Sequence, residues 1–201
     1  MKTKMLSPSI MDFALKNFAA TKPNTLINAL AVVAGSFLIV LSAQIYIPLP
    51  FTPVPITAQT LSVLLVGSLL GSKRAPLSVL LYVLYGALGF PVFSENSGGM
   101  QVLMGATGGY IFGFILAGYV VGKFTEMAWD KSLGKSLIAM TVAQLLIFVP
   151  GLLWLGQFVG YANVLEQGFY PFIIGGIIKT LLAGSSSVLA WTLIKKLSPK
   201  V

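Results

Sequence analysis

The 201-residue sequence contains no cysteine and no histidine. The first absence excludes disulfides and thiolate nucleophiles, and the second excludes imidazole metal ligands and imidazole general bases. Only five residues are acidic, so paired-carboxylate catalysis or a hard-cation site would need most of them in one place. We therefore expect no catalytic residues, no metal site and no cofactor in this chain.

The sequence is rich in long apolar runs. Hydrophobic residues make up 56% of the chain and charged residues only 9%, whereas soluble domains carry about 25% charged residues. A membrane-spanning helix needs about 20 mostly apolar residues. Six blocks roughly meet this length, at residues 26–45, 56–70, 75–89, 107–129, 136–158 and 170–194. The second and third are short, which favours a bundle that encloses a cavity over a plain bundle.

These blocks predict an all-α membrane protein with six transmembrane helices over residues 26–195, between an N-terminal segment at 1–25 and a tail at 196–201. Twelve of the thirteen basic residues lie in the N-terminal segment, between alternate blocks or at their facing ends, or after the last block, whereas the loops at 46–55, 90–106 and 159–169 contain none. Because Lys and Arg mark cytoplasmic loops, we expect both termini in the cytoplasm and a multi-pass protein of the cell membrane. Anionic lipid explains the net charge of +8 better than nucleic acid does, because a basic face interleaved with aromatic residues is absent.

The N-terminal segment carries a pattern typical of a short amphipathic helix. Ser7 and Pro8 predict a helix start, with Ser7 as the N-cap, and Met11, Leu15 and Phe18 follow on one face. Two interpretations remain for this segment, a helix lying on the membrane surface or a frayed tail.

Lys179 is the thirteenth base and lies inside the sixth block, about 13 Å from its outer end at 1.5 Å per residue. A charge at such a depth costs about 2.5–3.5 kcal/mol on the insertion scale, so it should face a partner or a cavity. None of the five acids lies at membrane depth, because Glu126, which falls within a block, is at the cytoplasmic end of the fourth. Three interpretations follow: Lys179 pairs with Glu95 or Glu166 from an outer loop, it extends outward to the membrane surface, or it binds an anionic or carbonyl-bearing ligand. We favour the ligand.

The loops at the outer side indicate where such a ligand would lie. The first contains four prolines, at positions 48, 50, 53 and 55, so residues 53–57 cannot form regular helix. The second, at 90–110, is rich in glycine and includes Asn96 and Tyr110. Irregular backbone at membrane depth is tolerated where it is buried or lines a cavity. We therefore predict a substrate cavity near the outer face, with Trp154 as a candidate wall.

Several of these segments resemble the BioY family, the membrane-embedded biotin-binding S-components of energy-coupling-factor transporters. The resemblance is carried by Ile-Pro-Leu-Pro at 47–50, Pro-Val-Pro-Ile-Thr-Ala-Gln-Thr-Leu at 53–61, the stretch from Leu81 to Phe93, Ser-Gly-Gly at 97–99 and Gly-Ala-Thr-Gly-Gly-Tyr at 105–110. It extends over all six blocks in order, and the motifs are specific when taken together.

The resemblance implies that the protein captures biotin from outside in a pocket roofed by the first outer loop. Lys179 falls on the family's ligand-binding Lys, and Gly176 stands where the family has an Asp. This departure leaves three possibilities: Glu95 or Glu166 substitutes, backbone acceptors serve, or the ligand differs from biotin. We expect biotin. We also expect Asn96 to be the family's loop Asn. Further candidates for contact with the substrate are Gln59, Tyr110 and Trp154.

Ala31 and Gly35 are four residues apart in the first block, a spacing that lets helices approach closely. They serve either packing within the chain or docking of a partner. The pair resembles the motif through which S-components meet a coupling transmembrane subunit. The sequence has no phosphate-binding loop, so any ATPase activity would come from partner subunits, unless the protein acts alone. The alternatives are transport of another vitamin or small carboxylic acid and, outside transport, a membrane assembly factor or an intramembrane enzyme. The enzyme is disfavoured because the blocks contain no His, Cys, Asp or Glu at membrane depth.

Overall fold

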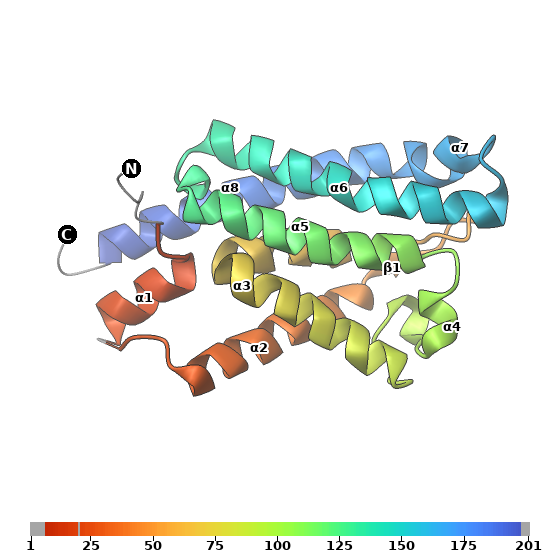
Figure 1. Ribbon diagram of the computed structural model, residues 1–201. Helices are drawn as coiled ribbons and strands as arrows, with labels where there is room; N and C mark the ends of the chain where they lie inside the picture. Colours follow the sequence, from red (N-terminus) through yellow and green to blue (C-terminus); the bar gives the residue numbers. More distant parts are fainter. Residues whose placement is uncertain (1–6, 20, 198–201) are drawn as a thin grey trace, which may run out of the picture.

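The computed structural model describes residues 7–19 and 21–197, and it is a bundle of long helices (Figure 1). Five helical stretches are long and apolar enough to cross a membrane. They are α2 (Thr25–Ala43), α3 (Gln59–Ala87), α5 (Gly108–Glu126), α6 (Leu133–Val159) and residues 164–197, which include α8 (Ile173–Leu197). The prediction of an all-α membrane protein is confirmed at the level of fold class.

Helix α3 covers most of both the second and the third predicted block. Gly71 interrupts it with a φ of 79°, a left-handed conformation that glycine adopts without strain. Gln59 lies twelve residues before Gly71 and Tyr82 eleven residues after it, and the Gln59 Nε2 atom donates a hydrogen bond of 2.5 Å to the Tyr82 hydroxyl. The two arms of α3 therefore lie side by side, which accounts for five long stretches where the sequence indicated six blocks.

The break in α3 is held against the end of α5 by Glu126. The Oε1 atom of Glu126 accepts hydrogen bonds from the backbone N–H of Ser72, at 3.1 Å, and from the Ser72 hydroxyl. Its Oε2 atom lies 3.2 Å from the Nζ atom of Lys123. The carboxylate thus binds the first N–H group of the second arm, where the partial positive charge of a helix start favours an anion.

The N-terminal segment forms the short helix α1 (Ile10–Phe18), so the frayed-tail interpretation is wrong for these residues. The predicted N-cap is also wrong: Ser9 caps the helix through a bond from the Asp12 N–H to its hydroxyl oxygen. Ser7 lies before the helix, where its N–H donates to the carbonyl of Glu126, at 2.8 Å, and its hydroxyl oxygen accepts from the Lys131 ammonium, at 2.8 Å. Residues 1–6 of the predicted segment and 198–201 of the predicted tail lie outside the described residues.

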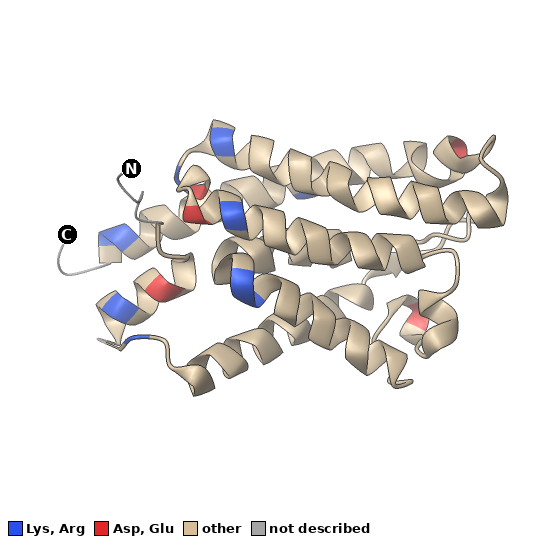
Figure 2. Ribbon diagram, in the orientation of Figure 1, with Lys and Arg blue, Asp and Glu red and all other residues tan. Residues whose placement is uncertain are grey.

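Helix α1 packs on the bundle through two contacts. Asp12 forms an ion pair of 2.7 Å with Arg74 of α3, and the Phe13 ring meets the ring of Trp191 on α8 edge to face, with centroids 5.1 Å apart. Figure 2 shows Lys and Arg gathered at this end of the molecule, which we call the basic end. The charge segregation that the sequence indicated is therefore present in three dimensions.

The opposite end, which we call the loop end, carries the short elements. Strands β1 (Tyr46–Ile47) and β2 (Ile56–Thr57) pair antiparallel, with Tyr46 opposite Thr57, which confirms that residues 53–57 are not helical. The other elements are η1 (Ser94–Asn96), α4 (Met100–Leu103), α7 (Val164–Gly168) and η3 (Tyr170–Phe172). The Thr52 hydroxyl donates to the carbonyl of Gln167, at 2.7 Å, and so fastens the first loop to the last.

Gly35 serves packing within the chain. A Cβ atom added there would lie 2.5 Å from the Ser78 hydroxyl oxygen and 3.0 Å from a methyl carbon of Leu70, on the two arms of α3. Gly35 is buried, and Ala31 is partly buried. Of the two interpretations of this pair, packing within the chain is the one seen at Gly35, because α3 occupies the space in front of it. Docking of a partner by the pair stays a prediction.

Candidate ligand-binding site

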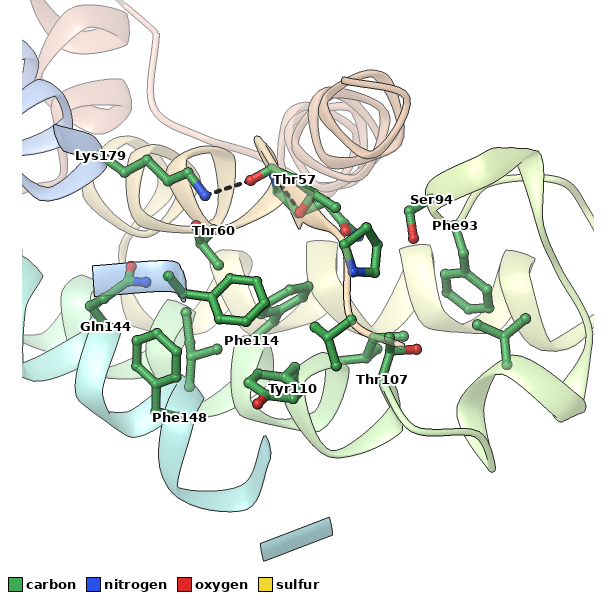
Figure 3. Close-up of a pocket in the computed structure, with 17 residues that line it drawn as sticks. Thr57, Thr60, Phe93, Ser94, Thr107, Tyr110, Phe114, Gln144, Phe148 and Lys179 are labelled. Carbon is green, nitrogen blue, oxygen red and sulfur yellow. Dashed lines mark hydrogen bonds between the residues drawn. The ribbon is translucent and has the colours of Figure 1, made fainter. Parts of the chain in front are cut away.

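A cavity lies between α3, α5, α6 and α8, covered by the segment that leads into α3 (Figure 3). Its polar lining residues come from β2, α3, η1, the start of α5, α6 and α8, and are Thr57, Gln59, Thr60, Ser94, Thr107, Gln144 and Lys179. Its aromatic lining residues come from the loop end and from α5 and α6, and are Phe93, Tyr110, Phe114, Phe148 and Phe172. The site thus combines one cation and a few neutral polar groups with an apolar wall, as small-molecule sites commonly do.

Lys179 lines this cavity and is bound by the backbone of the covering segment. Its Nζ atom donates a hydrogen bond of 2.6 Å to the carbonyl oxygen of Thr57. Neither ion pair found over residues 7–19 and 21–197 includes Lys179, so pairing with Glu95 or Glu166 does not occur there. An ammonium group has three N–H donors. Two of them remain for a ligand after the bond to Thr57.

Gln59 and Tyr110, both predicted contacts, line the cavity in fixed positions. Gln59 is buried and held by its bond to Tyr82. The Tyr110 hydroxyl donates to the carbonyl of Gly168, at 2.8 Å, and its ring meets the Phe148 ring edge to face. These side chains are held before any ligand binds, which lowers the entropy that binding would cost.

The structure does not bring Asn96 or Trp154 into the cavity. Asn96 is exposed, and it follows Glu95 in a turn where both residues have positive φ, so Ser94 lines the cavity instead. The Trp154 indole donates to the carbonyl of Gly105, at 2.9 Å, and so supports the glycine-rich segment from behind. Trp154 is therefore not among the residues that line the cavity in this structure.

Gly176 lies beside the cavity, on the far side of the Gln144 side chain. It lines an adjoining hollow between α6 and α8 that shares Gln144, Phe148 and Phe172 with the cavity. A Cβ atom added at Gly176 would lie 3.6 Å from the Nε2 atom of Gln144, which is ordinary contact. Position 176 therefore faces the Gln144 amide.

Several polar residues of the cavity were not among the predicted contacts, and two of them, Thr60 and Gln144, have an oxygen that is unpaired within the described part of the chain. Gln144 did carry a signal, because an amide in the middle of an apolar block needs a hydrogen-bond partner on another helix or in a cavity. Thr60 carried no signal, because threonine is common in transmembrane helices. In the structure the Thr60 hydroxyl oxygen and the Gln144 amide oxygen are both buried without a hydrogen-bond partner among the described residues.

The fold and the cavity define a helical membrane protein built around a small-molecule site. The BioY family matches residues 15–196 of the chain. The chain belongs to the BioY family.

Two relatives and one solved structure illustrate the similarity. The biotin transporter BioY of Thermotoga maritima is 39% identical over 155 residues, covering 75% of this chain and 88% of the relative. The biotin transporter BioY2 of Lactococcus lactis subsp. cremoris is 34% identical over 178 residues, covering 87% of this chain and 94% of the relative. The crystal structure of the S-component for biotin from an ECF-type ABC transporter superposes with a TM-score of 0.76 at 23% identity, covering 86% of this chain and 95% of that one. At that identity the superposition supports the fold alone.

Proposed function

We propose that this protein is the substrate-capturing membrane subunit of a biotin uptake system. The relatives that this chain matches over most of their length are named biotin transporters. The observation that carries the proposal is the environment of Lys179. This cation lies inside the bundle, in a cavity lined by aromatic rings, and it contacts a backbone carbonyl and no described acid. A cation with free N–H donors suits a ligand that offers oxygen acceptors.

The proposal includes a topology. The two arms of α3 cross the membrane separately, giving six crossings, and the basic end faces the cytoplasm because positive residues are retained there. The cavity then lies towards the outer face, beneath β1, β2 and the segment between them. This arrangement places the binding site on the side from which a nutrient arrives.

Transport itself would need partner subunits. The sequence has no phosphate-binding loop, so the energy of ATP hydrolysis would be supplied by ATPase subunits through a coupling transmembrane subunit. The chain's own part is to bind substrate and present it, without covalent chemistry. The exposed side of α2, which includes Leu30, Phe37 and Leu41, is available to lipid or to such a subunit.

Titration of the purified protein with biotin tests the proposed function. We expect a rise in melting temperature and saturable binding at sub-micromolar biotin, because a ligand that binds only the folded state stabilises it by mass action. Other vitamins and simple carboxylic acids serve as competitors. Binding of another vitamin in place of biotin would keep the class of protein and overturn the substrate, and binding of no small molecule would favour an assembly factor.

A further inference from the structure

Gln144 presents an unused acceptor to the cavity. Its side chain on α6 is only 7% exposed and lines the cavity, and its Oε1 atom is buried without a partner among the described residues. A buried carbonyl oxygen without a hydrogen bond is unfavourable, and few occur in native proteins. An acceptor left free in a binding cavity is paired most simply by a donor on the ligand.

The other polar groups of the cavity complement this acceptor. Lys179 offers only donors, and the Thr60 hydroxyl, whose oxygen is likewise buried and unpartnered, can donate or accept. Figure 3 draws Lys179, Thr60 and Gln144 on one side of the cavity and Phe93 on the other. A ligand group that carries both a carbonyl oxygen and an N–H pairs with all three residues. A carboxylate has acceptors only and leaves the Gln144 oxygen unpaired.

Gly176 keeps the Gln144 amide free of protein partners. It is a residue of α8 beside this amide, and it has no side chain that could bond to it. A serine at this position would bring a hydroxyl within reach of the amide, since its Cβ atom would already lie 3.6–3.9 Å from three atoms of the Gln144 side chain. An alanine would fill the same space without adding a donor or an acceptor.

We propose that Gln144 is a specificity-determining residue that accepts a hydrogen bond from an N–H of the ligand's urea or amide group. It thereby places that group, and not the carboxylate, at the polar end of the cavity beside Lys179. The inference rests on the proposed function, because biotin carries a cyclic urea at one end and a carboxylate at the other. It adds the orientation of the ligand and the residue that selects it.

The first experiment compares the dissociation constants of biotin, biotin methyl ester and the two singly N-methylated biotins for wild type and Gln144→Leu. We expect Gln144→Leu to weaken biotin and the methyl ester equally, by tenfold or more. The biotin methylated on the nitrogen that donates to Gln144 should bind wild type weakly. Its affinity should not fall further in Gln144→Leu, because the methyl group has already removed the hydrogen bond to Gln144. Thr141→Val, which removes a hydroxyl one turn away on α6 outside the cavity, is the matched control and should bind biotin as wild type does.

A second pair of variants tests the proposal even if Gln144→Leu fails to fold. Gly176→Ser should weaken biotin severalfold by engaging the Gln144 amide, whereas Gly176→Ala should bind as wild type does. Equal affinities in this pair overturn the proposal, as does a change below threefold in a folded Gln144→Leu. A loss seen with biotin but not with its methyl ester would place Gln144 at the carboxylate and also overturn it. If wild type itself does not bind biotin, the proposed function fails instead, which is a distinct result.

Discussion

The Nζ atom of Lys179 lies 2.6 Å from the carbonyl oxygen of Thr57, so the base buried in α8 is tied to the backbone of the segment that covers the cavity. The contact joins residues 122 positions apart in the chain. It connects α8 to the segment that covers the cavity through the Lys179 ammonium, which a ligand would also contact. Ligand binding and the position of the first outer loop should therefore be coupled.

Replacing Lys179 with methionine should remove biotin binding and leave the fold intact. Methionine keeps the length and apolar character of the side chain and loses the charge-assisted hydrogen bonds, which are worth about 1.5–3 kcal/mol each. We expect at least a tenfold rise in the dissociation constant, measured by calorimetry, with a change of only a few degrees in melting temperature. Lys135→Met, at an exposed position of the basic end, is the control and should bind normally. Unchanged affinity in Lys179→Met would contradict the assignment of the site.

The absence of native cysteine makes the topology directly measurable. Single cysteines at Lys135 (basic end) and Ala162 (loop end) occupy exposed positions. In intact cells a membrane-impermeant thiol reagent should label Ala162→Cys at once and Lys135→Cys only after the membrane is permeabilised. The reverse pattern would contradict the orientation that the basic residues favour.

Gly35→Val should destabilise the isolated protein, because the added atoms overlap Ser78 on α3. Overpacking of a tight contact costs about 1–3 kcal/mol, and a lower melting temperature would show it. Ala34→Val is the control, since Ala34 is exposed on the same helix. Ala→Val lowers helix propensity whereas Gly→Val raises it slightly, so a lower melting temperature of Gly35→Val reports overpacking and not propensity. Equal melting temperatures for the two variants would contradict the packing role of Gly35.

The class of fold and Lys179 could be predicted from the sequence, because hydropathy and charge act over whole blocks. Which other residues face the cavity could be predicted only in part, because this depends on backbone angles and on how the helices pack, and the hydropathy of one block contains neither. Positive φ at Glu95 and Asn96 turns Asn96 outward and leaves Ser94 at the cavity. Short-range patterns fix which residues occupy a turn, but the direction of each side chain follows from backbone angles that tertiary contacts select.

Helix ends and contacts between helices were also difficult to predict from local sequence patterns. Ser7 was the predicted N-cap, but the helix begins later and is capped by Ser9. The Ser7 N–H instead donates to the carbonyl of Glu126, 119 residues away. Gly35 had the spacing of a docking motif, and only the position of α3 decides that its small surface is already covered. Both outcomes depend on contacts between distant segments, which one sequence without its fold does not contain.

Asp130 should make the stability of the protein depend on pH at the basic end. One of its carboxylate oxygens accepts a bond from the Trp191 indole, and the other is buried without a partner among the described residues. Burial raises the pKa of Asp130 to about 6, although the Trp191 bond and the nearby charge of Lys131 oppose the shift. Lys131 also lies over the Trp191 ring, at 4.3 Å from its centroid.

A carboxyl group whose pKa is higher in the folded state than in the unfolded state binds protons more strongly when folded, so stability falls as pH rises between the two values. Wild type should therefore lose stability from about pH 4 to pH 6 and remain at the lower level above it. Asp130→Asn keeps an acceptor for Trp191 and cannot ionise. We expect it to melt at a higher temperature than wild type at pH 8, by an amount equivalent to at most about 3 kcal/mol, and to show a flatter profile across this window. Glu166→Gln, at an exposed position of the loop end, should keep the slope of wild type, and the same slope in Asp130→Asn would contradict the assignment.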